Sequence, residues 1–386
     1  MPSIPFARPW LGEPEADAAR RAILSGWVTQ GPEVAAFERE FAAWVGAPHA
    51  CAVSSATAAL HLALLAAGIG PGDEVVTVSS SFIATANVVR YCGAIPVFVD
   101  VDARTYNMVP ALVDAAIRPR TKAVLCVHQL GMPCDMQALT ALARRHGVAL
   151  VEDAACAVGS EVRVDDRWET IGRPHGDVAC FSFHPRKLLT TGDGGMLTTR
   201  HADWDARFRL ARQHGMSVPD TVRHTSARVV FERYPTLGYN YRLTDIQAAV
   251  GREQLKRLPA MIAHRRELAA RYHELLHDVP GVVGPSAPSF ARSNWQSYCV
   301  TLADGLEQQR VMQKMLDGGV ATRRGVMCAH LESSYPADTW RAGSSLETSE
   351  RNQRQGLMLP LFHELTADQQ RDVVALLRAA CDGRES

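Results

Sequence analysis

Between residues 50 and 200, short apolar runs alternate with stretches whose apolar residues recur every three to four positions. Short runs are typical of buried strands, and the periodic stretches are typical of amphipathic helices. We predict strands at 74–78, 96–99, 123–127, 149–152, 177–182 and 195–199, and helices at 56–67, 82–92 and 136–146. This alternation predicts an α/β fold with a large, mostly parallel sheet and helices on both faces. Ligands bind such sheets at the carboxyl ends of the strands.

The pattern changes after residue 200. The next part, residues 201–285, is mainly helical in pattern, with an irregular stretch at 223–240. Further on, the sequence predicts strands at 297–302 and 320–322 and helices at 307–316 and 367–381. This mixture predicts a smaller C-terminal α+β domain. We place the large domain at residues 1–255 and the small domain at residues 256–386.

Composition and charge exclude several classes of function. The chain has 41 basic and 41 acidic side chains, whereas nucleic-acid binders and polybasic membrane-surface proteins need a positive surface. No apolar run reaches the roughly 18 residues that span a bilayer, and the first ten residues lack a signal core, so we expect a cytoplasmic protein. The nine cysteines include no CxxC pair, so we expect free thiols and no metal site. Neither GxGxxG nor GxxxxGK[ST] occurs, which disfavours nicotinamide oxidoreductases and P-loop enzymes.

Four segments place polar side chains at strand ends or helix starts. In the first, Ser54, Ser55 and Thr57 lie where a strand ends and a helix begins. Such a helix start is either an anion site or a plain helix cap. In the second, Glu152 and Asp153 follow an apolar strand. A carboxylate there holds a protonated ring nitrogen, binds a metal, acts as a base or caps the next helix.

The third segment places Lys187 between the apolar run 181–183 and a glycine-rich turn at 190–195. A lysine in a partly desolvated site acts as a nucleophilic amine, and the alternative is a structural or phosphate-binding lysine. The chain has only four lysines: Lys122, Lys187, Lys256 and Lys314. The fourth segment, residues 238–247, is a polar loop that leads into a capped helix.

In combination, the anion site, the strand-end carboxylate and the amine match the needs of pyridoxal phosphate (PLP). Its phosphate needs N–H donors and hydroxyls, its ring nitrogen needs a carboxylate, and its aldehyde needs an amine. An aromatic ring should stack on the cofactor. Phe82 is the candidate for that role, and the alternative is a phenylalanine of the core.

These motifs, in this order, resemble the DegT/DnrJ/EryC1/StrS family of PLP-dependent sugar aminotransferases, which have the fold-type I architecture. The resemblance covers nearly the whole chain. The motifs that carry it lie at residues 25–32, 55–64, 80–87, 152–155, 182–187, 238–242 and 323–330.

The resemblance implies a catalytic role for two residues. Lys187 would hold the cofactor covalently and move the proton during transamination, and Asp153 would pair with the ring nitrogen. Phe82 would stack on the ring. Members of the family often have a glutamine where this chain has Cys156, and a thiol is a weak hydrogen-bond group. The glutamine contact to the cofactor would then be lost or supplied by another group.

The resemblance also implies contacts to the cofactor phosphate. Ala56, where the family often has glycine, and Thr57 would contact the phosphate largely through backbone groups. Ser182 would add its hydroxyl. Asn240 would reach the phosphate bound to a neighbouring subunit, so the resemblance implies a homodimer with active sites at the subunit interface.

The amino donor implied by the resemblance is L-glutamate or glutamine. The implied acceptor is a keto sugar, most commonly a nucleotide-linked 4-keto-6-deoxyhexose. Thr29, Arg323, Arg324 and His330 are the candidates for substrate contacts, with surface arginines and a packed loop histidine as the alternatives. Two other functions stay open: a keto-cyclitol aminotransferase and a non-catalytic PLP-binding sensor.

Overall fold

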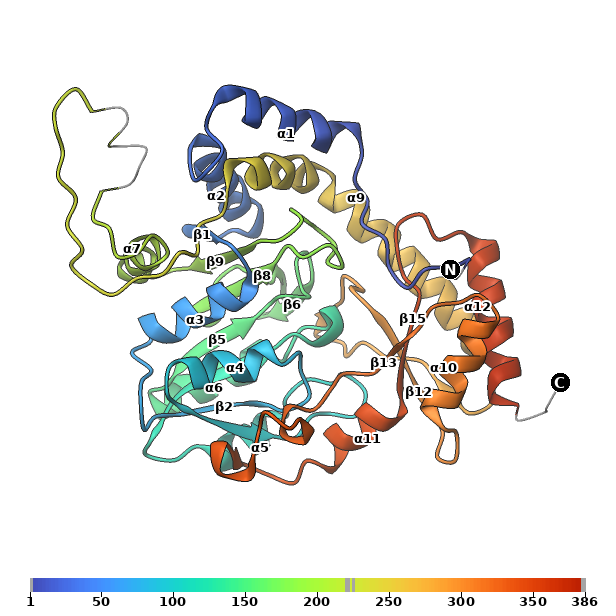
Figure 1. Cartoon of the computed structure of the whole chain (residues 1–386). Helices are drawn as coiled ribbons and strands as arrows, with labels where there is room; N and C mark the ends of the chain where they lie inside the picture. The colour runs from blue at the N-terminus through green and yellow to red at the C-terminus, as the bar shows by residue number, and fades with distance from the viewer. Residues whose placement is uncertain (1–2, 219–222, 224–225, 383–386) are drawn as a thin grey trace.

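The computed structural model describes residues 3–218, 223 and 226–382. Its largest sheet has eight strands in the order β1-β9-β8-β5-β4-β2-β3-β14 (Figure 1). These strands are β1 (His49–Val53), β2 (Glu74–Val78), β3 (Ile95–Val99), β4 (Thr121–Val127), β5 (Ala149–Asp153), β8 (Val178–Ser182), β9 (Gly195–Thr199) and β14 (Arg341–Ala342). Strand β9 is antiparallel to both neighbours and all other pairs are parallel. The predicted α/β fold with a mostly parallel sheet is confirmed.

Helices cover both faces of this sheet. One face packs on α3 (Ala56–Ala66), α4 (Ala84–Tyr91) and α7 (Ala202–Ala211). The other face packs on α2 (Pro32–Val45), α5 (Pro110–Ala116), α6 (Met136–His146) and the first part of α9 (Asp245–Leu276). Neighbours in a strand alternate between the faces, as Val75 and Val76 do in β2. Because helices cover both faces, all five residues of β2 are buried.

A separate hydrophobic core lies in the C-terminal part of the chain, around an antiparallel sheet in the order β10-β12-β15-β13. Its elements are β10 (Val282–Val283), β12 (Tyr298–Leu302), α10 (Gln308–Asp317), β13 (Arg323–Arg324), α11 (Glu347–Gln355), β15 (Gly356–Leu359) and α12 (Ala367–Cys381). Helix α9 enters both cores, because Leu255 and Leu258 pack under the large sheet whereas Leu268 and Tyr272 pack in the C-terminal core. The proposed division between residues 255 and 256 falls inside this helix, and its position stays a prediction.

The two cores exchange short segments of chain. Ile4 forms a bridge with Val320 and packs in the C-terminal core. In the opposite direction, β14 adds a parallel strand to the edge of the large sheet beside β3. Arg341 of β14 is held there by Glu74, with 2.7 Å between Nη2 and Oε2. The N-terminal and C-terminal parts therefore interlock.

Some elements differ from the predictions. Strands β6 (Glu161–Val164), β7 (Arg167–Thr170) and β11 (Ala291–Arg292) form a small sheet that we did not predict. The strand predicted at 320–322 is wrong, because residue 320 forms an isolated bridge and β13 begins at residue 323. Helix α1 (Glu13–Ser25) packs on α9, and short 3-10 helices lie at Gln129–Gly131, Ala329–Leu331 and Ala337–Thr339.

An extended arm, residues 226–238, projects from the body between α7 and α9 (Figure 1). Val229 and Phe231 are each 85% exposed and Leu237 is 80% exposed. Residues 224 and 225 of the predicted irregular stretch lie outside the described residues. Among the helices of the described ranges, none combines the length and apolar character that crossing a membrane requires.

Candidate active site

The carboxyl ends of β1, β5 and β8 meet at one edge of the large sheet. Gly195, the first residue of β9, pairs with Val53 at the end of β1 and with Ser182 at the end of β8. Asp153, at the end of β5, pairs with Cys180 of β8. Ligands of α/β sheets bind at this edge, and the structure brings three of the four predicted segments to it.

The helix that follows β1 offers unpaired backbone donors. The Ser55 hydroxyl caps α3 by accepting a hydrogen bond from the Ala58 N–H at 3.1 Å. Ala56 and Thr57 are the first two residues of α3, where N–H groups have no partner inside the helix. A Cβ on Gly195 would lie 2.5 Å from the Ser55 carbonyl oxygen, so glycine lets the strand approach the helix start. Together with the helix dipole, these donors suit a phosphate.

Asp153 presents a buried carboxylate at the same edge, with only 5% of the residue exposed. Its Oδ2 accepts a hydrogen bond from the Thr85 hydroxyl at 2.8 Å, and its Oδ1 accepts one from the Ala155 N–H at 3.1 Å. Burial raises the pKa of Asp153, and the hydrogen bond from Thr85 opposes this rise. Because the single Thr85 hydrogen points to Asp153, the Ser81 hydroxyl donates to Thr85, at 2.8 Å.

Lys187 follows β8 in a short loop and is half-buried. Its Nζ lies 3.0 Å from Cys156 Sγ, and its charge acts on Asp153. The loop is held from the C-terminal part of the chain, where Gln296 donates to the Arg186 carbonyl at 2.6 Å and accepts from the Leu188 N–H at 2.8 Å. This is the lysine that we singled out from the sequence.

Phe82 and Ser182 border the same region. Phe82 comes shortly after the end of β2 and is 65% exposed, so its ring is not part of the core. The Ser182 hydroxyl accepts a hydrogen bond of 3.5 Å from the His184 N–H and is half-buried. Both side chains are therefore open to a ligand.

Asn240 is exposed at the base of the arm. The neighbouring residues Tyr239 and Tyr241 stack at 5.0 Å, and the Tyr241 hydroxyl lies 3.1 Å from Nδ1 of His61 on α3. The Tyr241 carbonyl also accepts a hydrogen bond from Ser54 at 2.8 Å. The loop with Asn240 is thus fixed against the start of α3, while the arm beyond it points away from the body.

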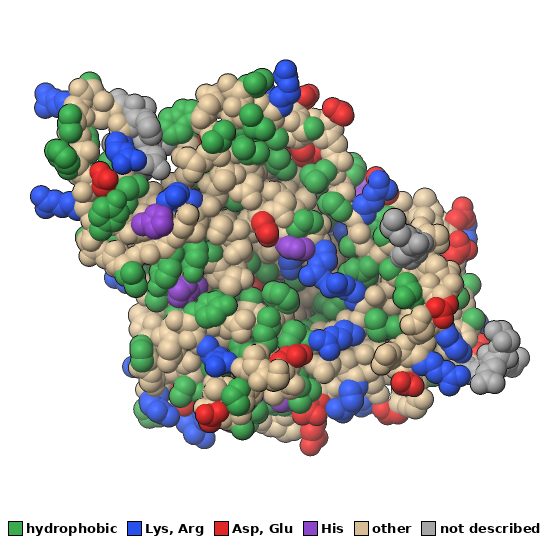
Figure 2. All heavy atoms as spheres, in the orientation of Figure 1, with side chains coloured by type: hydrophobic (Ala, Val, Ile, Leu, Met, Phe, Trp, Pro, Cys, Tyr) green, Lys and Arg blue, Asp and Glu red, His purple; other side chains and the backbone are tan. Residues whose placement is uncertain are grey.

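The two arginine candidates for substrate contact form β13, and both are exposed. The Arg323 guanidinium lies 5.7 Å from the centroid of the Phe6 ring. Partial burial and then the charge of Arg323 lower the pKa of Arg186, so the Arg323 charge acts on the loop of Lys187. Arg324 instead lies 3.5 Å from Glu332. In Figure 2, Lys and Arg side chains gather near the middle of this face of the molecule.

The other two substrate candidates, Thr29 and His330, differ in how closely the surrounding protein packs around them. Thr29 is exposed, and its carbonyl accepts a hydrogen bond from the Asp245 N–H at 2.9 Å. His330 is tightly packed, with Nδ1 2.6 Å from Ser79 Oγ and Nε2 3.3 Å from Glu350 Oε1. The structure therefore gives both ring nitrogens of His330 a partner within the chain.

We missed two features of the site in the sequence. The first is the hydrogen-bonded series from Ser81 through Thr85 to Asp153. The sequence contained a local indication of it, because Ser81 and Thr85 are four residues apart where a helix follows a strand. The second is Gln296, for which the sequence contained no local indication. The backbone groups of Arg186 and Leu188 that it contacts are more than 100 residues away in the chain.

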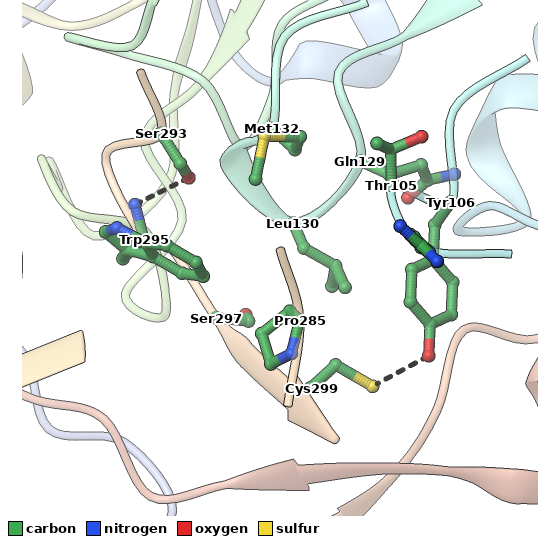
Figure 3. Close-up of a pocket in the computed structure, with 11 residues that line it drawn as sticks. Thr105, Tyr106, Gln129, Leu130, Met132, Pro285, Ser293, Trp295, Ser297 and Cys299 are labelled. Atoms are coloured by element: carbon green, nitrogen blue, oxygen red, sulfur yellow. Dashed lines mark hydrogen bonds between the residues drawn. The ribbon is translucent and has the colours of Figure 1, made fainter. Parts of the chain in front are cut away.

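A cavity of about 20 Å³ lies beside this region, between the loop after β4 and the start of β12 (Figure 3). Three of its lining residues, Tyr106, Leu130 and Trp295, have positive φ values of 62°, 58° and 52°, a strained backbone for residues other than glycine. The space is enough for about one water molecule. Since Gln129 beside it donates to the Ser80 carbonyl, this junction supports the loop that follows β2.

The chain is similar to known proteins over almost its whole length. Residues 9–378 match the model of the DegT/DnrJ/EryC1/StrS aminotransferase family. The chain is 37% identical over 386 residues to the spore coat polysaccharide biosynthesis protein SpsC of Bacillus subtilis (strain 168), with 99% of this chain and 98% of SpsC covered.

Solved structures of aminotransferases are also similar to this chain over almost its whole length. The aminotransferase TlmJ from Streptoalloteichus hindustanus is 36% identical, with a TM-score of 0.89 and coverage of 98% of this chain and 99% of TlmJ. DesV from S. venezuelae is 34% identical, with a TM-score of 0.88 and full coverage of both chains. The similarity includes the C-terminal core as well as the large sheet.

Proposed function

The chain belongs to the DegT/DnrJ/EryC1/StrS aminotransferase family, and from this premise we propose that it transfers an amino group from L-glutamate or glutamine to a nucleotide-linked 4-keto-6-deoxyhexose. As a member of this family, it is a PLP-dependent sugar aminotransferase. The observation that carries the proposal is the meeting of Lys187, Asp153 and the start of α3 at one sheet edge.

The residues at this edge fit PLP. Asp153 is buried, and within the described part of the chain no salt bridge compensates its charge, so a protonated ring nitrogen would supply the missing positive charge. The free N–H groups of Ala56 and Thr57 and the Ser182 hydroxyl suit the phosphate. The exposed ring of Phe82 offers a face for stacking.

PLP supplies an electron sink for the carbon that carries the amino group. In this chain, Asp153 would supply the negative charge for the ring nitrogen and Lys187 would move the proton. The hydrogen bonds from Thr85 and Ala155 favour the ionised form of Asp153, and that form would keep a ring nitrogen protonated. Lys187 would hold the cofactor through Nζ, and its amine, when free, would accept a proton from the substrate carbon and return it.

Two observations support a sugar nucleotide as acceptor. By its name, the relative SpsC takes part in polysaccharide biosynthesis. In this chain Arg186 and Arg323 lie near Lys187, and neither has a carboxylate partner among the described residues. Guanidinium groups bind phosphates in a bidentate manner. An uncharged keto-cyclitol would leave both groups unused, so a panel of nucleotide keto sugars and keto-inositols separates the two substrates.

We also propose a homodimer. The apolar side chains of Val229, Phe231 and Leu237 on the arm are in contact with water in the single chain, and a second copy would cover them. Asn240 at the base of the arm would then reach the phosphate in the other subunit's site.

The proposal is tested through the half-reaction with L-glutamate. We expect the wild-type absorbance band of bound PLP to change to that of the pyridoxamine form, and Lys187→Ala to abolish this change. Lys256→Ala is the matched control, because Lys256 is exposed on α9 and pairs with Glu253. Borohydride treatment and peptide mapping should fix the cofactor to Lys187.

Normal turnover of glutamate by Lys187→Ala would show that the assignment is wrong. A protein that binds PLP but forms no pyridoxamine with any amino donor would be a sensor and not an enzyme.

A further inference from the structure

Cys156 and Lys187 form a thiol–amine pair inside the site. The distance from Lys187 Nζ to Cys156 Sγ is 3.0 Å, and neither residue is fully buried. Arg186 is close enough to Cys156 for an electrostatic interaction. Both partners are anchored, since Asn294 donates to the Cys156 carbonyl at 3.0 Å and Gln296 donates to the Arg186 carbonyl. Positively charged, partly exposed surroundings are those in which cysteines react.

The other thiols have different surroundings. All nine cysteines are free, and seven of them are buried. Burial raises the pKa of five of these seven: Cys51, Cys92, Cys180, Cys299 and Cys328. A hydrogen bond with Cys134, followed by burial, raises the pKa of Cys126. The remaining half-buried thiol, Cys381 on α12, has no hydrogen-bonded amine among the described residues, and burial raises its pKa to about 11. Cys381 is therefore a matched control.

We propose that Cys156 and Lys187 are an oxidative modification site, at which a peroxide joins the two side chains through a sulfur–nitrogen bond. The Cys156 sulfur attacks the peroxide, so that an S–O bond forms, the O–O bond breaks and one water leaves. The amine of Lys187 then attacks this sulfenic acid, so that an S–N bond forms, the S–O bond breaks and a second water leaves. The thiol is oxidised by two electrons, and the peroxide is reduced to two waters.

The state of the cofactor controls whether the sulfur–nitrogen bond forms. This part of the proposal rests on the proposed function. When PLP is bound to Nζ, the Lys187 amine is occupied and the S–N bond does not form. When the cofactor is absent or carries the amino group itself, the amine is free beside the sulfur. A peroxide therefore blocks the enzyme at one half of its reaction cycle, and a thiol reductant restores it.

The test uses the full-length protein in three forms: without cofactor, with PLP and with pyridoxamine phosphate. Each form is treated with hydrogen peroxide, and intact mass and peptide mapping are the readouts. We expect the first and third forms to lose about 2 Da, the mass of two hydrogens, and to give a cross-linked peptide pair containing Cys156 and Lys187. Dithiothreitol should reverse the change. Cys381→Ser should behave as the wild type, and Cys156→Ser should lose the cross-link.

Oxidation that only adds about 16 or 32 Da at Cys156 in the wild type without cofactor would overturn the proposal. A cross-link that still forms in Cys156→Ser would also overturn it. Cross-linking at equal rates with and without PLP would leave the modification site standing and would contradict the attachment of the cofactor to Lys187. Failure of the modification and failure of the proposed function are thus distinguishable.

Discussion

Thr85 offers a direct test of how the site controls the charge of Asp153. Its hydroxyl donates to Asp153 Oδ2 at 2.8 Å, and both atoms are buried. The substitution Thr85→Val keeps the shape of the side chain and removes this donor. Burial already raises the pKa of Asp153 and the bond from Thr85 opposes that rise, so the substitution should raise the pKa further.

The size of the effect follows from the kind of bond. A hydrogen bond to a charged group contributes about 1.5–3 kcal/mol, and each 1.4 kcal/mol is roughly a factor of ten. We therefore expect Thr85→Val to weaken PLP binding or to lower kcat/KM by about 10- to 100-fold. Because the neutral carboxyl cannot hold a protonated ring nitrogen, the acid limb of the pH profile should move to higher pH.

The assay is a titration with PLP followed by absorbance, together with kcat/KM across pH. Thr85→Ser is the control, because it keeps the hydroxyl and should keep most of the affinity. Ser81→Ala should have a smaller effect, since the bond from Thr85 to Asp153 remains. A Thr85→Val variant that is folded and has wild-type PLP affinity and an unchanged acid limb would refute this reasoning.

Three further predictions concern stability and assembly. Asp245→Ala should lower the free energy of unfolding by about 3 kcal/mol, measured in urea, because Asp245 accepts three backbone hydrogen bonds at the start of α2, and Asp245→Asn should lose less. Burial, followed by nearby positive charges, lowers the pKa of His363 to about 4 from 6.5, so the unfolded chain binds an extra proton between these values. Stability should fall as pH drops from 6.5 to 4, and His363→Gln should flatten that slope in thermal unfolding. The double substitution Phe231→Ser and Leu237→Ser should shift sedimentation toward the monomer, while Val283→Ser, at an exposed valine of β10, should not.

Local sequence was enough to predict which polar residues would lie at this edge of the sheet. Asp153 lies two residues past the apolar run 148–151, and Lys187 lies four residues past the run 181–183. The carboxyl ends of parallel strands in a βαβ pattern lie at the same sheet edge. The order of polar residues along the chain therefore indicates which of them meet. Helix α4 began two residues later than predicted, at a position where propensity alone is a weak guide.

The parts that depend on distant partners were not predicted. Strand β13 consists of two exposed arginines and exists because β15 pairs with it, so its own composition gives no strand signal. Val320, in an apolar segment that we predicted as a strand, is instead covered by Ile4 from the other end of the chain. Gln296 holds the loop of Lys187 across more than 100 residues, and no local pattern indicates that contact.

The continuity of α9 has a consequence for how the molecule loses its structure. This one helix of 32 residues contributes side chains to both cores, and Ile4 and β14 tie each core to a segment from the other end of the chain. Neither core can melt without unwinding a helix on which the other is packed. Heat should therefore unfold the chain in a single calorimetric transition, with equal calorimetric and van't Hoff enthalpies, and a fragment cut within α9 should not retain either core.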